Sequence, residues 1–534
     1  MVFMNPPLNE ARSRMGPVAR LFARALALAL VAGAWCLPAY AADADVERVR
    51  ATTTKLINML LEQGLITRAK ADELLKEMDA PAARPPVTGA ASSATPAAAQ
   101  TPATTVRVPF VPEFVRKEIK DELRAELSAQ ARQEGWAGPG TVPAWVRGMR
   151  WEGDLRSRFQ SDQYDPLNAP AIGVVETNRT RALTLTNTTE DRQRLRVRAR
   201  LGLAVTADSN WSGNLRLTTG STSDPVTSNQ TLGNYGNRFT VAFDRASIRY
   251  RQGGNFNMVA GRFGNPWFGT DLVWDSDLAF DGVAAQWTPL VSTWGKAFFT
   301  AAAMPVQEVE LSSADKWLYG VQAGMEWPGR GLVSGRLGVG YYHFSNLVGQ
   351  ANAAGSSLND FTAPAFAQRG NTYFNISSDP ARPLLALASD YRLVNLTGTI
   401  SMVTIGYKNL VLTADYVKNL GFKAGPVSAR VGTAVAAETD GYLLRASLGD
   451  EDVDALHRWQ VFISYKNLKR DAVPDAFTDS DLRGGGTDVK GYSLGASYGL
   501  GKNTAATVRW LSGDAVSGAP LSLDSLRVDL STRF

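Results

Sequence analysis

Hydrophobic and polar side chains alternate along most of the chain beyond residue 145. The clearest case runs from Arg192 to Val205, where arginines occupy every second position as far as Arg200 and mainly leucine, valine and alanine stand between them. A period of two residues is typical of a β-strand whose two faces meet different surroundings. We predict strands at residues 149–160, 192–206, 211–220, 239–251, 256–263, 280–289, 296–305, 316–327, 333–345, 390–407, 410–418, 440–449, 456–467, 487–499, 504–512 and 524–534.

The connections between these strands alternate in length. Short turns are expected at 207–210, 252–255, 328–331, 408–409 and 500–503, whereas most of the connections between them are long. A transmembrane β-barrel has this asymmetry, because its short turns face the periplasm and its longer loops face the outside. A soluble β-sandwich has no reason to sort its loops in this way. We therefore predict an all-β transmembrane barrel of about 16 antiparallel strands over residues 145–534.

The last strand has the pattern expected at the end of such a barrel. Leu526, Val528, Leu530, Thr532 and Phe534 share one face of it. A C-terminal aromatic residue on an alternating strand resembles the signal that the barrel assembly machinery recognises, so Phe534 is the candidate assembly signal. Eight tryptophans near predicted strand ends are candidates for the aromatic girdles at the lipid interfaces: Trp151, Trp211, Trp287, Trp294, Trp317, Trp327, Trp459 and Trp510.

The free-energy cost of placing a charged side chain in hydrocarbon indicates which face of the strand the arginines occupy. An arginine on the lipid face near the bilayer midplane costs roughly 2–4 kcal/mol, so several on one strand must face the lumen. Sixteen strands are expected to enclose a water-filled channel rather than a packed interior. A basic wall would raise the local concentration of anions, which predicts a mild anion preference. The predicted pore-lining residues are Arg156, Arg158, Arg192, Arg194, Arg196, Arg198 and Arg200.

The first 41 residues are typical of a signal peptide. Four arginines precede the apolar run Ala25 to Leu37, which is too short to span a bilayer as a mature helix. Small residues at positions 39 and 41 predict cleavage after Ala41. A lipoprotein anchored through Cys36 is the alternative, although the bulky Trp35 before that cysteine fits such processing poorly.

Residues 42–135 have helical rather than strand periodicity. Residues 42–78 are predicted to form a helical hairpin or short coiled coil, which could serve oligomerisation in the periplasm. Residues 79–108 are rich in Pro, Ala, Ser and Thr, so we expect an extended linker there. Residues 109–135 follow as an amphipathic helix whose apolar stripe steps by four residues. We predict that these helices lie in the periplasm.

The composition excludes several classes of protein. With 44% hydrophobic and 20% charged residues, the chain is too apolar for a disordered protein and too polar for a polytopic helical membrane protein. One cysteine and two histidines argue against a zinc site. The formal net charge is +5, of which residues 1–41 supply a large part through four arginines and one glutamate, so no nucleic-acid partner is expected.

Four segments carry a family resemblance: residues 148–159, 190–205, 224–234 and 261–285. They are similar to the family of putative porins of Gram-negative outer membranes. The resemblance implies a porin-type barrel in the outer membrane, in contact with membrane lipid, that passes small hydrophilic solutes or ions. It also implies a homotrimer, but it supplies no particular solute.

The predicted loop 265–278 follows from this resemblance. In sixteen-stranded porins the loop after the fifth strand folds into the lumen and forms a constriction, with acids facing an arginine wall. Asp271, Asp275 and Asp277 fit the acidic side. Two other interpretations stay open, namely an ordinary outer loop with solvated carboxylates and a calcium site, although the spacing of an EF-hand is absent.

We thus predict a porin for passive diffusion, without catalysis, cofactor or metal. The first alternative is an outer-membrane barrel enzyme of lipase or protease type, whose base would have to be His343, near Ser345, or His457. The second is a barrel that anchors a periplasmic binding segment. A plugged, gated transporter is disfavoured, because it would need about 22 strands and a compact plug domain.

Overall fold

The computed structural model describes residues 148–170, 187–292, 295–310, 312–329 and 333–534. The predicted signal peptide, helical hairpin, linker and amphipathic helix lie outside these residues, and so does Trp294. No helix within the described ranges is long and apolar enough to cross a membrane.

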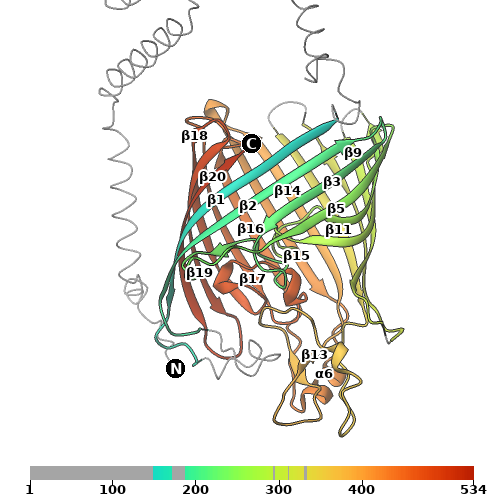
Figure 1. Cartoon of the computed structure of the whole chain (residues 1–534). Helices are drawn as coiled ribbons and strands as arrows, with labels where there is room; N and C mark the ends of the chain where they lie inside the picture. The colour runs from blue at the N-terminus through green and yellow to red at the C-terminus, as the bar shows by residue number, and fades with distance from the viewer. Residues whose placement is uncertain (1–147, 171–186, 293–294, 311, 330–332) are drawn as a thin grey trace, which may run out of the picture. The chain divides into compact units, whose positions relative to one another are not determined.

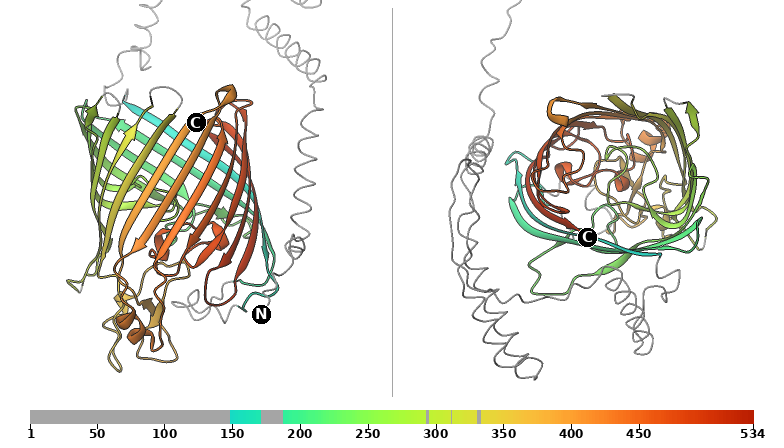
Figure 2. Two further views of the ribbon diagram at one scale, coloured as in Figure 1. Left: turned by 180° about the vertical axis from the view of Figure 1, so that it is seen from behind. Right: turned by 90° about the horizontal axis from the view of Figure 1, so that it is seen from above.

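Sixteen long strands of the described chain form one closed antiparallel barrel (Figures 1 and 2). Each strand pairs with its neighbours along the chain, and β20 pairs with β1 to close the cylinder. The strands are β1 (Met149–Tyr164), β2 (Arg192–Thr206), β3 (Trp211–Thr219), β5 (Val241–Gln252), β6 (Phe256–Gly264), β7 (Ala279–Trp287), β9 (Gly295–Gln307), β10 (Lys316–Trp327), β11 (Val333–Ser345), β14 (Arg392–Val403), β15 (Asn409–Asn419), β16 (Asp440–Gly449), β17 (Trp459–Leu468), β18 (Val489–Gly501), β19 (Thr504–Ala515) and β20 (Ser522–Arg533). The prediction of a 16-stranded barrel is confirmed.

The strand ends differ from the predicted ones by a few residues. Four short strands were not predicted, because each is too brief to show a period of two residues. β4 (Gln230–Thr231) pairs with β2, and β8 (Leu290–Ser292) pairs with β9. β12 (Tyr373–Asn375) and β13 (Leu385–Leu387) form a separate hairpin in a long loop.

The two faces of the wall meet different surroundings. On β1, Leu155 points outward and is 47% exposed, whereas Arg158 points inward and is 1% exposed. On the neighbouring strand, Leu530 is 52% exposed outside and Asp529 is 5% exposed inside. Both strands of the closing pair, β1 and β20, therefore place apolar side chains outside the barrel and charged side chains inside it.

Part of the barrel interior is packed with apolar side chains, beside a polar cavity of about 900 Å³. A large apolar cluster lies inside the barrel at the end that carries the long loops. It joins inward side chains at the strand ends, such as Tyr342 and Leu393, to side chains of the loops, such as Trp274 and Val473. The long loops thus bury apolar surface within the barrel, because their sequences carry large apolar side chains that water would otherwise surround.

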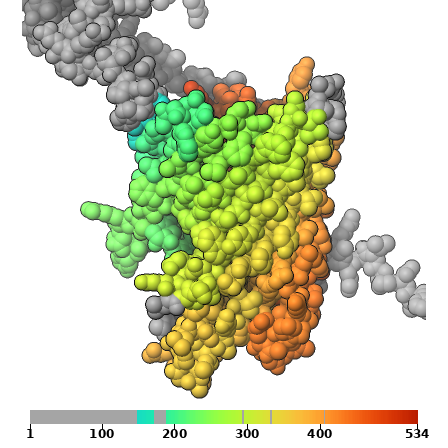
Figure 3. Space-filling view, turned by 90° about the vertical axis from the view of Figure 1, so that its right-hand side faces the viewer, coloured from blue at the N-terminus to red at the C-terminus, as the bar shows by residue number. Residues whose placement is uncertain are grey.

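The same loops build a small projection beyond the barrel (Figures 1 and 3). The β12–β13 hairpin and helix α6 (Ala424–Val431) share an apolar core that includes Phe374, Ile376 and Val427. Helix α6 ends at Gly432, whose φ of 83° is a left-handed conformation that glycine adopts without strain. The 3-10 turn η4 (Asp360–Thr362) lies in the same long loop as the hairpin.

The C-terminal residue packs against a glycine on β1. The backbone of Gly153 exchanges two hydrogen bonds with Phe534, at 2.8 and 3.0 Å. A Cβ atom added to Gly153 would lie 2.4 Å from the Phe534 ring. The ring therefore has room because residue 153 lacks a side chain.

We expect Gly153→Leu to displace the Phe534 ring and to destabilise the closing seam, since overpacking of this kind costs about 1–3 kcal/mol. When samples are heated to a series of temperatures before electrophoresis, the temperature at which half of the folded band has disappeared should fall. Gly213→Leu on β3 is the matched control, because a Cβ there meets no atom within 4 Å. Equal midpoints for the two variants would contradict the role assigned to this contact.

Candidate functional site: the lumen and its two inward loops

The predicted arginine row of β2 lies against acidic and polar side chains of β1. The register places Arg198 opposite Arg156 and Arg196 opposite Arg158. Asp154 accepts hydrogen bonds from Arg198 at 2.7 and 2.9 Å and from Arg200 at 2.6 Å. Most of these guanidinium groups are therefore paired within the wall rather than free.

The other members of the row have different surroundings. Arg194 forms an ion pair with Asp162. Arg196 donates to the side-chain carbonyl of Gln160 at 3.3 Å. Arg192 is exposed at the first residue of β2. Along the row the partners are therefore Asp154 for Arg200 and Arg198, the amide of Gln160 for Arg196, Asp162 for Arg194 and solvent for Arg192.

The two arginines of β1 also differ. Arg158 is buried and donates two hydrogen bonds to Asp529 on β20, at 2.6 and 2.9 Å. Arg156 donates to the amide oxygen of Asn229 at 2.6 Å, and its Nε has no partner. No ion pair of the described residues includes Arg156. Of the two β1 arginines, Arg156 is therefore the one without an ion pair among the described residues.

The 265–278 loop enters the barrel and is anchored to the far wall. Thr270 donates to Asp415 on β15 through its hydroxyl, at 2.6 Å, and through its backbone N–H, at 3.0 Å. The backbone of Phe268 exchanges hydrogen bonds with the Gln322 side chain of β10, at 2.6 and 2.8 Å. Trp274 packs edge-on against Tyr342, with ring centroids 5.1 Å apart. Local turns and these distant partners together hold the loop inside.

The three aspartates of this loop point to different partners. Asp277 lies 3.5 Å from both Arg198 and Arg200, and it accepts hydrogen bonds from Ser228. Asp271 lies 3.5 Å from Lys466. Among the described residues, Asp277 is the one of the three that contacts the β2 arginines.

Asp275 is buried between two loops. Its carboxyl oxygens accept hydrogen bonds from the backbone N–H groups of Asp277, at 2.8 Å, and Ser480, at 2.9 Å. Burial raises the pKa of Asp275 to about 8, and the nearby Asp479, Asp481 and Asp277 add to the effect. Asp275 is therefore mostly neutral at pH 7.

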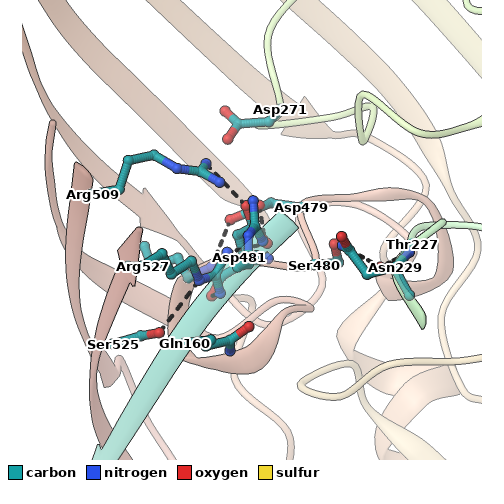
Figure 4. Close-up of polar contacts among 12 residues, drawn as sticks. Gln160, Thr227, Asn229, Asp271, Asp479, Ser480, Asp481, Arg509, Ser525 and Arg527 are labelled. Atoms are coloured by element: carbon teal, nitrogen blue, oxygen red, sulfur yellow. Dashed lines mark hydrogen bonds and ion pairs between the residues drawn. The ribbon is translucent and has the colours of Figure 1, made fainter. Parts of the chain in front are cut away.

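A second inward loop, residues 469–488, was not predicted from the sequence. Its Asp481 forms ion pairs with Arg527 of β20 and, at 3.3 Å, with Arg509 of β19 (Figure 4). Burial acts to raise the pKa of Asp481, but the arginines outweigh it and hold that pKa well below its usual range. The Gly484–Gly485–Gly486 turn, with φ of 75°, 96° and 87°, was the available signal of a sharp reversal there.

The two inward loops are joined to each other. The backbone N–H of Asp275 donates to the carbonyl of Phe477 at 2.8 Å, and the Thr478 hydroxyl donates to the carbonyl of Leu272 at 2.9 Å. Lys466 of β17 holds the second loop through Asp479, at 2.9 Å. The paired loops form a partition across part of the lumen, although they are separated by about 200 residues in the chain.

A polar cavity of about 900 Å³ lies beside this partition. Seven basic and eight acidic side chains line it, so its charges nearly balance. The basic ones are Arg156, Arg158, Arg198, Arg445, Lys466, Arg509 and Arg533, and the acidic ones are Asp154, Asp271, Asp275, Asp277, Glu451, Asp479, Asp481 and Asp529. Serine and threonine hydroxyls of β14–β20, such as those of Thr399, Ser493 and Ser531, line it as well.

Neither histidine lines this cavity. His343 alternates on β11 with the inward residues Tyr342 and Phe344, and its Nδ1 has no partner. The Nδ1 of His457 lies 2.6 Å from the Tyr498 hydroxyl at an exposed site. Within the described part of the chain, no group of three or more His, Cys, Asp or Glu side chains is arranged to hold a metal ion.

Comparison with known proteins gives one family. The family model described as "Putative porin" matches residues 50–534. Similar solved structures include OprB of Pseudomonas putida, with 11% identity, 74% of this chain and 97% of that chain covered, and a TM-score of 0.44. OmpF of Salmonella typhi in complex with daunomycin has 11% identity, coverage of 73% and 99%, and a TM-score of 0.39. DcaP of Acinetobacter baumannii, an outer membrane channel, has 11% identity, coverage of 72% and 97%, and a TM-score of 0.38. No curated protein matches the chain.

The buried carboxyl of Asp275 should make stability depend on pH. Its pKa is about 8 in the folded chain against 3.8 when exposed, so the folded state holds a proton that the unfolded state loses. The stability of the wild type should therefore fall as the pH rises from about 4 to about 8. In Asp275→Asn this part of the decline should be absent.

Thermal midpoints in detergent between pH 5 and pH 9 test this prediction, and the two slopes should differ by a few °C over the range. Exposed Asp452→Asn is the control and should keep the wild-type slope. Parallel slopes for Asp275→Asn and the wild type would contradict the neutral state of Asp275.

Proposed function

The chain belongs to the Putative porin family of outer-membrane channels, and we propose that it lets small hydrophilic solutes cross the outer membrane by passive diffusion. The observation that carries the proposal is the polar cavity of about 900 Å³ inside a closed barrel. Charged groups and hydroxyls on its wall can replace part of the hydration shell of a passing solute. The cavity volume is in the range of small-molecule sites, which sets the scale of the solutes.

The selectivity that we propose is a mild anion preference. Three guanidinium groups of the cavity lining, those of Arg156, Arg445 and Arg533, take part in none of the ion pairs of the described residues. Arg533 is exposed as the last residue of β20, whereas Arg156 and Arg445 lie within the strands β1 and β16 of the wall. Arg445 lies over the Phe462 ring, at 4.5 Å from its centroid. With Asp275 mostly neutral, seven basic side chains stand against seven other acidic ones in the lining, so the proposed preference rests on the placement of these two arginines and not on an excess of positive charge. The preference therefore comes from these two side chains more than from the whole β2 row.

The two inward loops are proposed to set the size of the passage. The 265–278 loop supplies the acidic face with Asp277 and Asp271, and the β1–β2 wall supplies the basic face. Asp277 itself contacts Arg198 and Arg200, so the space for a solute lies between Asp271 and the β1–β2 wall, where a transverse electric field would orient dipolar molecules. The 469–488 loop narrows the same space from the opposite side of the lumen.

The family favours a channel over the enzyme alternative. A barrel anchor for a periplasmic segment depends on residues outside the described ranges. A homotrimer, cleavage after Ala41 and recognition of Phe534 by the assembly machinery remain parts of the proposal. Gel filtration with light scattering on the purified mature chain tests the trimer.

Removing the guanidinium groups of Arg156 and Arg445 should shift the selectivity toward cations. We expect the double variant Arg156→Gln, Arg445→Gln to lower the chloride-to-potassium permeability ratio by about twofold to tenfold, as expected for up to about 1.4 kcal/mol of lost attraction. Reversal potentials in a salt gradient across planar bilayers measure this ratio. Arg262→Gln, which removes an outward ion pair with Asp281, is the control and should leave the ratio unchanged.

The anion preference would be refuted if the wild type were cation-selective. The channel itself would be refuted if the folded barrel gave no conductance steps at all. These two results are separate, because conductance does not depend on the sign of the selectivity.

Loosening the second inward loop should change the conductance itself. Asp481→Asn removes the carboxylate that pairs with Arg527 and Arg509, and leaves Arg527, at 3% exposure, without it. The loss of a partner from a buried ion pair costs about 3–5 kcal/mol, so the loop should detach from the wall. We expect larger and more variable single-channel conductance, with Asp452→Asn as the control. An unchanged distribution of conductances would show that this loop does not limit the passage.

A further inference from the structure

Four outward-facing tyrosines lie side by side on the barrel wall. Tyr416, Tyr442, Tyr465 and Tyr492 stand on the consecutive strands β15, β16, β17 and β18. Tyr442 and Tyr465 have ring centroids 6.0 Å apart, and Tyr465 and Tyr492 have centroids 4.8 Å apart. All four are near the strand ends that lead into the long loops, which face the outside in a transmembrane barrel. They mark the outer lipid–water interface on this side of the barrel.

A basic tier follows directly beyond the tyrosines. Each tyrosine is succeeded, two residues nearer the long loops and therefore on the same face, by Lys418, Asp440, Asn467 or Lys490. Lys469 lies next to this tier, and Asp440 is 3.4 Å from Lys418 and 3.1 Å from Lys469. One carboxylate is thus shared by two ammonium groups, while Lys490 is exposed. We name Lys418, Lys469 and Lys490 the outer lysine tier.

The charge of this region is unbalanced. On β14 the outward Arg392 has its own partner, Asp390, at 3.0 Å. On the other side of the barrel the outward Arg262 is likewise matched by one carboxylate, Asp281, at 2.8 Å. The outer lysine tier differs, because Lys418 and Lys469 share Asp440 as their ion-pair partner and Lys490 takes part in no ion pair among the described residues. On β19, Asp514 stands directly opposite Lys490 in the register, so the three lysines have two carboxylates, Asp440 and Asp514, beside them.

An apolar hollow of about 540 Å³ lies on the same strands. Small residues form part of its lining, namely Gly398, Ala414 and Ala446 on β14, β15 and β16. Leu412, Leu444, Ile463, Tyr465 and Tyr492 are among its other lining residues. The hollow therefore reaches the tyrosine row from the side of the hydrocarbon.

We propose that this face binds a phosphorylated lipid of the outer leaflet, of the lipid A type. The hollow would take one of its acyl chains, the tyrosines would lie at the ester and sugar level, and the outer lysine tier would bind its phosphate. The hollow, the tyrosine row and the outer lysine tier are thus arranged in the same order as the acyl chains, the interfacial region and the phosphates of such a lipid. An apolar hollow alone would suit any lipid, but the lysines beyond it select an anionic headgroup.

Charge also favours this lipid over a second copy of the chain related by a two-fold axis. Two copies that met through this face by a two-fold axis would bring the lysine tiers together without added carboxylates. A phosphate group supplies the missing negative charge and several acceptor oxygens for the ammonium groups.

Native mass spectrometry of the purified full barrel in detergent tests the proposal. The probes are bis-phosphorylated lipid A and the same lipid with both phosphates removed. We expect the wild type to bind the phosphorylated form about tenfold or more tightly than the other, as about 1 kcal/mol per lysine implies. The triple variant Lys418→Gln, Lys469→Gln, Lys490→Gln should lose this difference.

A matched triple variant controls for the loss of charge. Lys296→Gln, Lys408→Gln and Lys502→Gln lie at the short-turn end of the barrel and should keep the wild-type preference. Ala446→Phe, which fills the hollow, should weaken both lipids by a similar factor. If the triple tier variant folds poorly, the single variant Lys490→Gln should still show a reduced preference, because Lys490 belongs to no ion pair among the described residues.

Three results would overturn the proposal. The first is equal binding of the two lipids to the wild type, and the second is equal loss in the tier and control variants. The third is a dimer cross-linked through cysteines placed at Ala446 that excludes the lipid, which would assign this face to a second copy. Conductance is recorded for every variant and should be unchanged, so failure of this proposal is distinct from failure of the channel.

Discussion

The closure of the sheet between β1 and β20 is the constraint on which the rest of the structure depends. In hydrocarbon no water can bond to a free backbone N–H or C=O group, so a sheet with an open edge cannot span a bilayer. Eleven residue pairs join the first and last strands, from Asp154–Arg533 to Tyr164–Leu523. Once the cylinder is closed, every strand has one face toward lipid and one toward the interior, and the alternation of side chains follows.

Closure also concentrates charged side chains inside the barrel. Their mutual repulsion determines where carboxylates are needed in the interior. Arginines that are too costly on the lipid face gather in the lumen, where they repel one another unless carboxylates lie between them. The wall provides Asp154 and Asp529, and the inward loops provide Asp277 and Asp481. The ion pairs that hold the inward loops in place therefore include charged side chains that also line the passage and affect its selectivity. Stability and permeation are coupled through these ion pairs.

The interior contains two environments with different tasks. At the end with the long loops, apolar side chains from the loops and strand ends pack into a core that fixes the inward loops in place. Beside this core lies the polar cavity, lined by charges and hydroxyls. A rigid apolar support next to a polar passage keeps the position of charged groups such as Asp277 well defined, since packed cores resist displacement.

The sequence by itself determined the strands, their faces and the class of fold. These features are local, because a period of two residues requires nothing beyond the neighbours along the chain. The strand pattern also located the 265–278 loop between the predicted fifth and sixth strands, whereas its position inside the lumen was expected from the family resemblance. The position of the 469–488 loop inside the lumen was not predicted. The β2 arginines were predicted to form a basic wall of unpaired charges, whereas most of them have hydrogen-bond or ion-pair partners.

Only the tertiary structure decided which charges are compensated and which loops enter the lumen. Asp481 meets Arg527 across 46 residues, and Asp275 meets Ser480 across 205. No periodicity in the chain encodes such pairs, since they depend on barrel closure bringing distant strands and loops together. The outer lysine tier arises in the same way, because its members become neighbours only when β15–β18 lie side by side. The sequence of each strand therefore determines which side chains lie on each of its faces, and closure of the barrel determines which other residues those side chains contact.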